Sequence, residues 1–195
     1  MSRHLGVTIT DRGAAIVTVE RQAVRNLTPD AEPARVIGPL GAGLDPGWRP
    51  LSGADDALLV VGIERLPFSL AAVTERVRAL DDPEARFIVD AEGLGSALWA
   101  VVGHPAEPKR WQLYSGRGLE RQALVDELLV ALQQDRFHFA AGLAEQAAMS
   151  KALLSYRRQV REDGLIGSEL VVALLLALIP PPVTYVRKAR RAVGF

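Results

Sequence analysis

Residues 87–95 read Phe-Ile-Val-Asp-Ala-Glu-Gly-Leu-Gly, an apolar run that ends on an acid and is followed by two glycines. This pattern indicates a buried strand, a tight turn and the start of the apolar helix expected over residues 94–102. Open α/β sheets bind ligands at the carboxyl ends of their strands, so this strand carries Asp90 to the place where a site would form. The simpler interpretation is that Asp90 caps the helix that follows it.

The segments on either side of this stretch predict an α/β domain. Two β-branched runs, residues 5–10 and 14–20, are separated by Asp11-Arg12-Gly13 and are typical of an antiparallel hairpin. Apolar runs predict further strands, and apolar spacings of three to four residues predict helices, of which the first is expected to be capped by Ser69 and the last by Ser168. The expected strands are residues 57–65, 86–90 and 111–115 with a short extended piece at 137–139, and the expected helices are residues 70–80, 94–102, 119–134, 145–161 and 169–179.

An antiparallel front end that continues into parallel strand–helix–strand crossovers is the plan of a ribonuclease-H-like fold. We therefore expect a mixed central sheet of about five strands flanked by helices, with a generic doubly wound sheet as the alternative. The domain is expected over residues 1–182, with an irregular insertion rich in proline and glycine at 26–56. Residues 183–195 make up a basic tail after the domain.

The composition excludes several classes of protein. The 195 residues include 23 basic and 23 acidic ones, so the chain as a whole has no electrostatic attraction for nucleic acid. Without cysteine it has no disulfides or thiolate metal sites, which is typical of a reducing cytoplasm. The longest apolar run, residues 170–179, is about half of the roughly twenty residues that a membrane span needs, so we expect a buried helix and no membrane partner. The chain has no P-loop motif, which argues against an ATPase.

Two acids occupy positions at which nucleases with such a sheet bind divalent metals. Nucleases of this architecture hold two divalent metals between carboxylates from the first strand, from the end of the parallel strand beside it, and from a late helix. Asp90 occupies the second of these positions, and Glu169 opens the last helix, where the helix dipole favours an acid. Plain capping of that helix is the alternative role of Glu169. The three histidines, His4, His104 and His138, lack metal-ligand spacing and are expected to be solvated or satisfied in the core.

Four blocks of sequence together resemble the nuclease domain of phage terminase large subunits, the motors that package DNA. The third block is Val-Asp-Ala-Glu-Gly-Leu-Gly at 89–95, where the family favours Asp-Ala-Thr-Gly-Val-Gly. The others are Leu-Gly-Val-Thr at 5–8 with Ala-Ile-Val-Thr-Val-Glu at 15–20, Glu-Arg-Leu-Pro-Phe at 64–68 leading to a helix that ends at 75–80, and a long block from 121–125 through 135–139 and 153–156 to Glu-Leu-Val-Val-Ala-Leu at 169–174. The resemblance spans most of residues 5–180.

This resemblance implies a DNA endonuclease that depends on Mg²⁺ or Mn²⁺, with Asp90 and Glu169 as catalytic metal ligands. Its implied partners are double-stranded DNA and phage packaging or capsid components, in the bacterial cytoplasm or in the phage particle. The sequence departs from the family in three of its motifs. Its first metal ligand, an aspartate, aligns with Thr8; its His-Asp-Asp motif aligns with Gly167, Ser168 and Glu169; and a common lysine is replaced by Arg121.

The departures favour a metal site that is weakened or lost. A threonine hydroxyl does not replace a charged oxygen that bridges two Mg²⁺ ions, so Asp11 or Glu92 would have to complete the site. Our primary hypothesis is a structural or interaction module in phage DNA packaging that needs no cofactor. The alternatives are an active endonuclease that uses Mg²⁺ or Mn²⁺, and, less favoured, a small-molecule enzyme that uses the turn at residues 93–95.

The basic tail has two interpretations. Residues 183–195 contain four basic residues and no acidic one. This composition is typical of a solvated terminus or of an arm that contacts phosphates or a partner protein. With Arg121, these cations are the candidate nucleic-acid contacts: Arg187, Lys188, Arg190 and Arg191.

Overall fold

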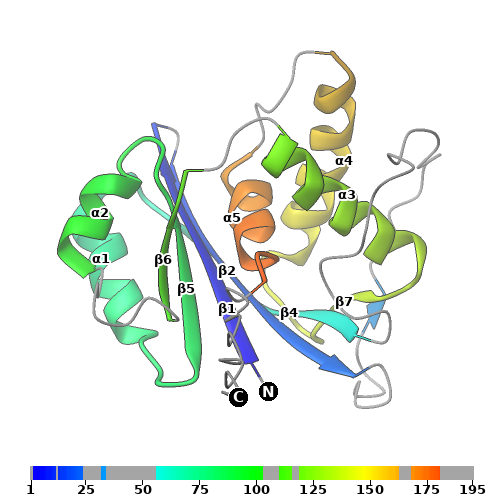
Figure 1. The fold of residues 1–195 in the computed structure, drawn as a ribbon, viewed down its shortest axis with the longest axis horizontal. Helices are drawn as coiled ribbons and strands as arrows, with labels where there is room; N and C mark the ends of the chain where they lie inside the picture. The colour runs from blue at the N-terminus through cyan, green and yellow to red at the C-terminus, as the bar shows by residue number, and fades with distance from the viewer. Residues whose placement is uncertain are drawn as a thin grey trace, which may run out of the picture.

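The computed structural model describes residues 2–11, 13–23, 32–33, 56–102, 110–115, 119–162 and 168–180, which form an α/β fold. A mixed β-sheet is covered by helices on both faces (Figure 1). The expected basic tail at 183–195 and most of the expected insertion at 26–56 lie outside the described residues. None of the described helices is both long enough and apolar enough to span a membrane.

The sheet has seven strands over the described residues, in the order β3-β7-β4-β2-β1-β5-β6. Strands β1, β2 and β4 form an antiparallel meander, β5 and β6 continue it in parallel to β1, and β7 is parallel to β4. The short β3 pairs antiparallel with β7. The strands are β1 Ser2–Thr10, β2 Gly13–Ala23, β3 Glu32–Pro33, β4 Asp56–Leu66, β5 Ala85–Asp90, β6 Trp111–Tyr114 and β7 Phe137–Phe139.

The sheet is therefore wider than the five strands expected, because two short pieces extend it beyond β4. Strand β7 is the predicted extended piece, and its two phenylalanines are buried and pack edge to face. Strand β3 lies inside the segment that was expected to be irregular, and Asp56, the last residue of that segment, begins β4. Two paired residues are too few to produce a periodic signal in the sequence.

The helices form two layers. Helices α1 (Leu70–Ala79) and α2 (Gly95–Val102) cover one face, and α3 (Leu119–Gln133), α4 (Gln146–Glu162) and α5 (Glu169–Ala177) cover the other (Figure 1). The predicted cap of α1 is confirmed, because Ser69 Oγ accepts a hydrogen bond from Ala72 N–H at 3.3 Å. Side chains alternate along each strand, so the sheet contributes to two separate cores.

Helix α5 is central, as its nearly continuous apolar sequence predicts. Its residues from Leu170 to Ala177 are almost all buried, and it packs on β1, β2 and α4. It crosses β1 at Gly6, where a Cβ atom would lie only 1.8 Å from the carbonyl oxygen of Ala173. A side chain at position 6 is therefore incompatible with this crossing, and the glycine lets helix and strand backbones touch.

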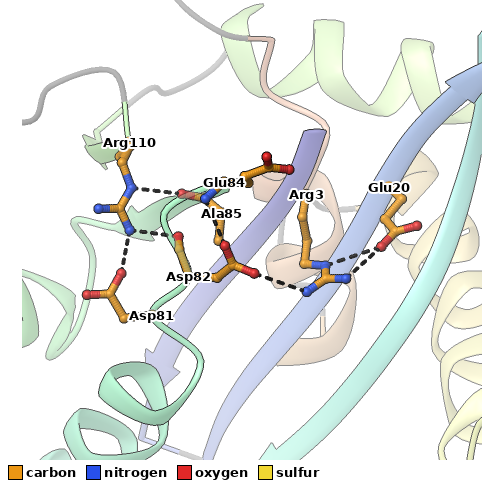
Figure 2. A network of polar contacts seen from close by, with 7 residues as sticks. All are labelled: Arg3, Glu20, Asp81, Asp82, Glu84, Ala85 and Arg110. Atoms are coloured by element: carbon orange, nitrogen blue, oxygen red, sulfur yellow. Dashed lines mark hydrogen bonds and ion pairs between the residues drawn. The ribbon is translucent and has the colours of Figure 1, made fainter. Parts of the chain in front are cut away.

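The edge of the sheet where β1 and β5 begin is held by a surface network of ions (Figure 2). Arg3 contacts Glu20 on β2 at 3.0 Å and Asp82, before β5, at 3.7 Å. Arg110, which precedes β6, pairs with Asp81 and donates to the carbonyl oxygens of Asp82 and Ala85. The network joins β1, β2, β5 and β6 at one edge and leaves the opposite, carboxyl edge free of it.

Candidate functional site

The register of the sheet places Asp90 next to Thr8 at the carboxyl edge. The parallel pairing of β1 with β5 runs as far as Val7 with Val89, and the next residues are Thr8 and Asp90. On the other side, Thr8 pairs with Ala15, and Ala15 pairs with Arg65 on β4. This row of side chains lies on the face that α5 covers, because Ala15 belongs to the core under α5.

Asp90 is the last residue of its strand, as predicted, and is only 3% exposed. Its Oδ1 accepts a hydrogen bond from Glu92 N–H at 3.2 Å, so the carboxylate holds the turn that follows the strand. Helix α2 begins only at Gly95. The turn is thus one structural role of Asp90, beside any role in a site.

The two glycines of this turn are required by packing of the chain itself. Gly93 has a φ of +57°, and a Cβ atom there would lie 2.5 Å from the carbonyl oxygen of Ile9 at the end of β1. At Gly95 a Cβ atom would lie 1.5 Å from the carbonyl oxygen of Asp90. These close approaches account for both glycines without a bound phosphate, which weakens the interpretation of the turn as a small-molecule site.

Glu169 lies at the same edge as Asp90. It is the first residue of α5, its side chain is 18% exposed, and its Oε1 lies 3.9 Å from Nε of Arg65, a member of the row that includes Asp90. Ser168 occupies the predicted N-cap position, and its carbonyl oxygen accepts from Val171 and Val172. The prediction of a side-chain cap was wrong, because the buried Ser168 hydroxyl has no hydrogen-bond partner among the described residues.

Arg65 contacts a second acid that the sequence analysis missed. Its Nε lies 3.8 Å from Oε2 of Glu145, in the turn before α4. An acid directly before an amphipathic helix is an ordinary feature of sequence, so no local signal distinguished Glu145. Only the docking of α4 beside α5 brings it to Arg65.

The other predicted site residues are placed less favourably. Asp11 is exposed in the connection between β1 and β2, and Glu92 is exposed in the turn after β5. Across the part of the chain that the structure describes, no three His, Cys, Asp or Glu side chains are grouped closely enough to hold a metal ion. The side chain of Arg121, on α3, lies outside the described residues, as do Arg187, Lys188, Arg190 and Arg191.

A second polar cluster, formed by His4, Arg21 and Arg86, surrounds the other end of α5. Arg86 donates to the carbonyl oxygen of Ile179 at 2.8 Å and to the side chain of Gln112, and Arg21 donates to the carbonyl oxygen of Leu178. Positive charge at a helix C-terminus is favourable. We refer to these three residues as the basic cluster.

Burial perturbs the titration of the basic cluster. Desolvation first, and then the charges of Arg21 and Arg86, lower the pKa of His4 to about 4, so this histidine is neutral at pH 7. Desolvation and the charge of Arg21 lower the pKa of Arg86 to about 10, which leaves it charged at pH 7. The sequence predicted that each histidine would be either solvated or satisfied in the core. His4 lies in the core, but its Nδ1 has no hydrogen-bond partner among the described residues.

Comparison with known proteins adds no assignment: no family model matches the chain, and no curated protein does.

Proposed function

We propose that this chain is a ribonuclease-H-like domain, similar to a terminase nuclease domain, whose metal centre has been weakened or lost. In this proposal it acts as a structural or interaction module in phage DNA packaging. The strand order supports the fold, because β4, β2 and β1 form the antiparallel meander and β5 and β6 follow by parallel crossovers, as that plan requires.

The observation that carries the proposal is the row Arg65, Ala15, Thr8, Asp90 at the carboxyl edge. A two-metal site needs charged oxygen ligands from neighbouring strands, and β1 offers the neutral hydroxyl of Thr8 at the position beside Asp90. The guanidinium of Arg65 adds a positive charge close to Glu169, which disfavours a metal cation there. The residues at this edge therefore do not fit a two-metal centre, and we derive no catalytic step through one.

The second candidate function is an active endonuclease that uses Mg²⁺ or Mn²⁺. It is favoured by one observation, that the two acids expected as ligands, Asp90 and Glu169, come from separate elements to the same edge and the same face of the sheet. Asp11 or Glu92 would have to move toward them to complete the ligands.

Plasmid nicking in Mn²⁺ separates the two candidates. Wild type and Asp90→Ala would be assayed beside Glu84→Ala, which removes an exposed acid at the opposite edge of the sheet. We expect no Mn²⁺-dependent nicking by any of the three. Nicking by wild type and Glu84→Ala that disappears in Asp90→Ala would overturn the proposal.

A binding assay tests the module itself. Fluorescence anisotropy with a labelled DNA duplex in EDTA measures DNA binding without metal, and phosphate contacts would make the affinity fall as salt rises. We expect salt-sensitive binding without cleavage. A folded protein that neither binds nor cuts DNA would remove DNA from its proposed partners.

A further inference from the structure

Two carboxylates from elements far apart in the sequence converge on a single nitrogen atom. Glu145 precedes α4, Glu169 begins α5, and both lie beside Nε of Arg65, at 3.8 and 3.9 Å. Within the described residues these are the two ion pairs of Arg65. The arginine thus lies within 4 Å of two acids, one from the turn before α4 and one from the first turn of α5.

Two neighbouring carboxylates repel each other unless a cation lies between them. Mg²⁺ and Mn²⁺ commonly bind through one or two carboxylates and keep several water molecules as their other ligands. A guanidinium and a hydrated divalent cation cannot occupy the same space. Arg65 therefore both neutralises part of the negative charge of the pair and occupies the space in which such a cation would bind.

The contacts of Arg65 are loose. Both distances exceed the range of about 2.7–3.2 Å for a hydrogen bond, and 47% of the Arg65 side chain is exposed. Ion pairs of this kind contribute about 0–1 kcal/mol to stability. We therefore expect that the charge of Arg65 can be removed at little cost in stability.

The residue before Arg65 shows the contrast. Glu64 receives two hydrogen bonds from Arg76 of α1, at 2.5 and 2.8 Å, and Arg76 has its pKa raised by these bonds. This pair joins β4 to α1, in the helical layer opposite α5. Adjacent residues of β4 thus take part in two different kinds of ion pair. Glu64 forms a short, hydrogen-bonded pair with Arg76, and Arg65 forms long pairs at the candidate site.

We propose that Arg65 is a built-in counter-cation, which takes the place of a divalent metal between Glu145 and Glu169 and excludes such metals from this edge of the sheet. The inference rests on the proposed function for treating this edge as a former metal site. The exclusion itself follows from the contacts of Arg65.

The test is Mn²⁺ binding, measured by calorimetry and by the EPR signal of free Mn²⁺, on wild type, Arg65→Gln and Arg76→Gln. We expect Arg65→Gln to bind one Mn²⁺ at least about tenfold more tightly than wild type, a change of about 1.4 kcal/mol. Arg76→Gln, which removes an arginine from the neighbouring pair, should bind like wild type. Glu169→Gln combined with Arg65→Gln should abolish the gain.

Two results would overturn the inference: a folded Arg65→Gln protein without increased Mn²⁺ affinity, or a wild type that binds Mn²⁺ as tightly as the variant. Arg65→Met, which keeps the aliphatic stem, replaces Arg65→Gln if the latter fails to fold by circular dichroism. Failure of the proposed function is distinguishable. If wild type nicks DNA through Asp90 while Arg65→Gln still gains Mn²⁺ affinity, the module proposal fails and the role of Arg65 stands.

Discussion

The two ends of helix α5 lie in opposite surroundings. At its N-terminal end, Glu169 is partly exposed and lies near the loosely held Arg65. At its C-terminal end, Arg86, which is buried, and Arg21, which is partly buried, donate hydrogen bonds to the last carbonyl oxygens. Both arrangements suit the helix dipole, but only the second is buried and hydrogen-bonded.

This difference concentrates the stabilising contacts at one end of the helix and leaves the other end as a candidate site. Buried hydrogen bonds to charged groups are costly to break, so the basic cluster fixes the position of α5 on the sheet. Partly exposed ion pairs contribute little, so we expect the pairs of Arg65 at the N-terminal end to add little to folding stability. Polar residues that the fold does not need, at the carboxyl edge of a sheet, are candidates for a site.

The largest expected effect comes from Gly6, the crossing point between the two ends. In Gly6→Ala the new Cβ would meet the backbone of Ala173 and Ala177, which a change of rotamer cannot relieve. We expect a loss of at least about 3 kcal/mol in urea denaturation, or no folding. Gly142→Ala is the control, because its Cβ would meet nothing within 4 Å, and its φ of +76° costs about 1 kcal/mol. Equal losses in both variants would contradict the crossing.

The second prediction concerns pH at the C-terminal end. The pKa of His4 is about 4 in the folded protein and 6.5 when unperturbed, so the unfolded chain binds this proton first as the pH falls. The folded state should therefore lose stability between pH 6.5 and pH 4, by roughly 3 kcal/mol at most. Urea denaturation across this window would measure the loss. Acidic residues also titrate in this range, so the informative quantity is the difference in unfolding free energy between wild type and His4→Gln. If this difference does not vary with pH, His4 is not a buried neutral histidine.

Arg86→Met tests the anchoring of the C-terminal end directly. The substitution removes one donor to the carbonyl oxygen of Ile179 and the donor that Arg86 offers to the Gln112 side chain, and we expect a loss of about 2 kcal/mol. Thermal or urea denaturation would measure it. Arg78→Met, at an exposed position of α1, should change stability by less than about 0.5 kcal/mol. Similar values for the two variants would mean that Arg86 does not anchor α5.

The smallest effect is expected at the N-terminal end. Glu169→Gln removes the ion pair with Arg65 and a favourable charge at the helix dipole, and should cost about 0.5 kcal/mol in low salt and less in high salt. Urea denaturation at two salt concentrations would measure it. A cost as large as that of Arg86→Met would remove the contrast between the two ends and make Glu169 a structural residue.

Local sequence patterns were sufficient to predict most helices and strands and the positions of two candidate site residues at the ends of those elements. The run 87–90 predicted the strand that carries Asp90 to its end, and the apolar run from Leu170 predicted the central helix that begins at Glu169. Both are properties of consecutive residues. The hydroxyl of Ser168 shows the limit, because whether a capping bond forms depends on how the preceding chain approaches the helix.

The sequence by itself determined the elements, their periodic burial and the acids at two element ends, because these depend on neighbours within a few positions. Only the tertiary structure decided which charges meet. The docking of α4 and α5 joins Glu145 and Glu169 to Arg65 on β4, and the crossing at Gly6 brings Arg21 and Arg86 to the end of α5. Residues separated by many positions carry no signal of their future neighbours, so the counter-cation between two acids became visible only in the folded chain.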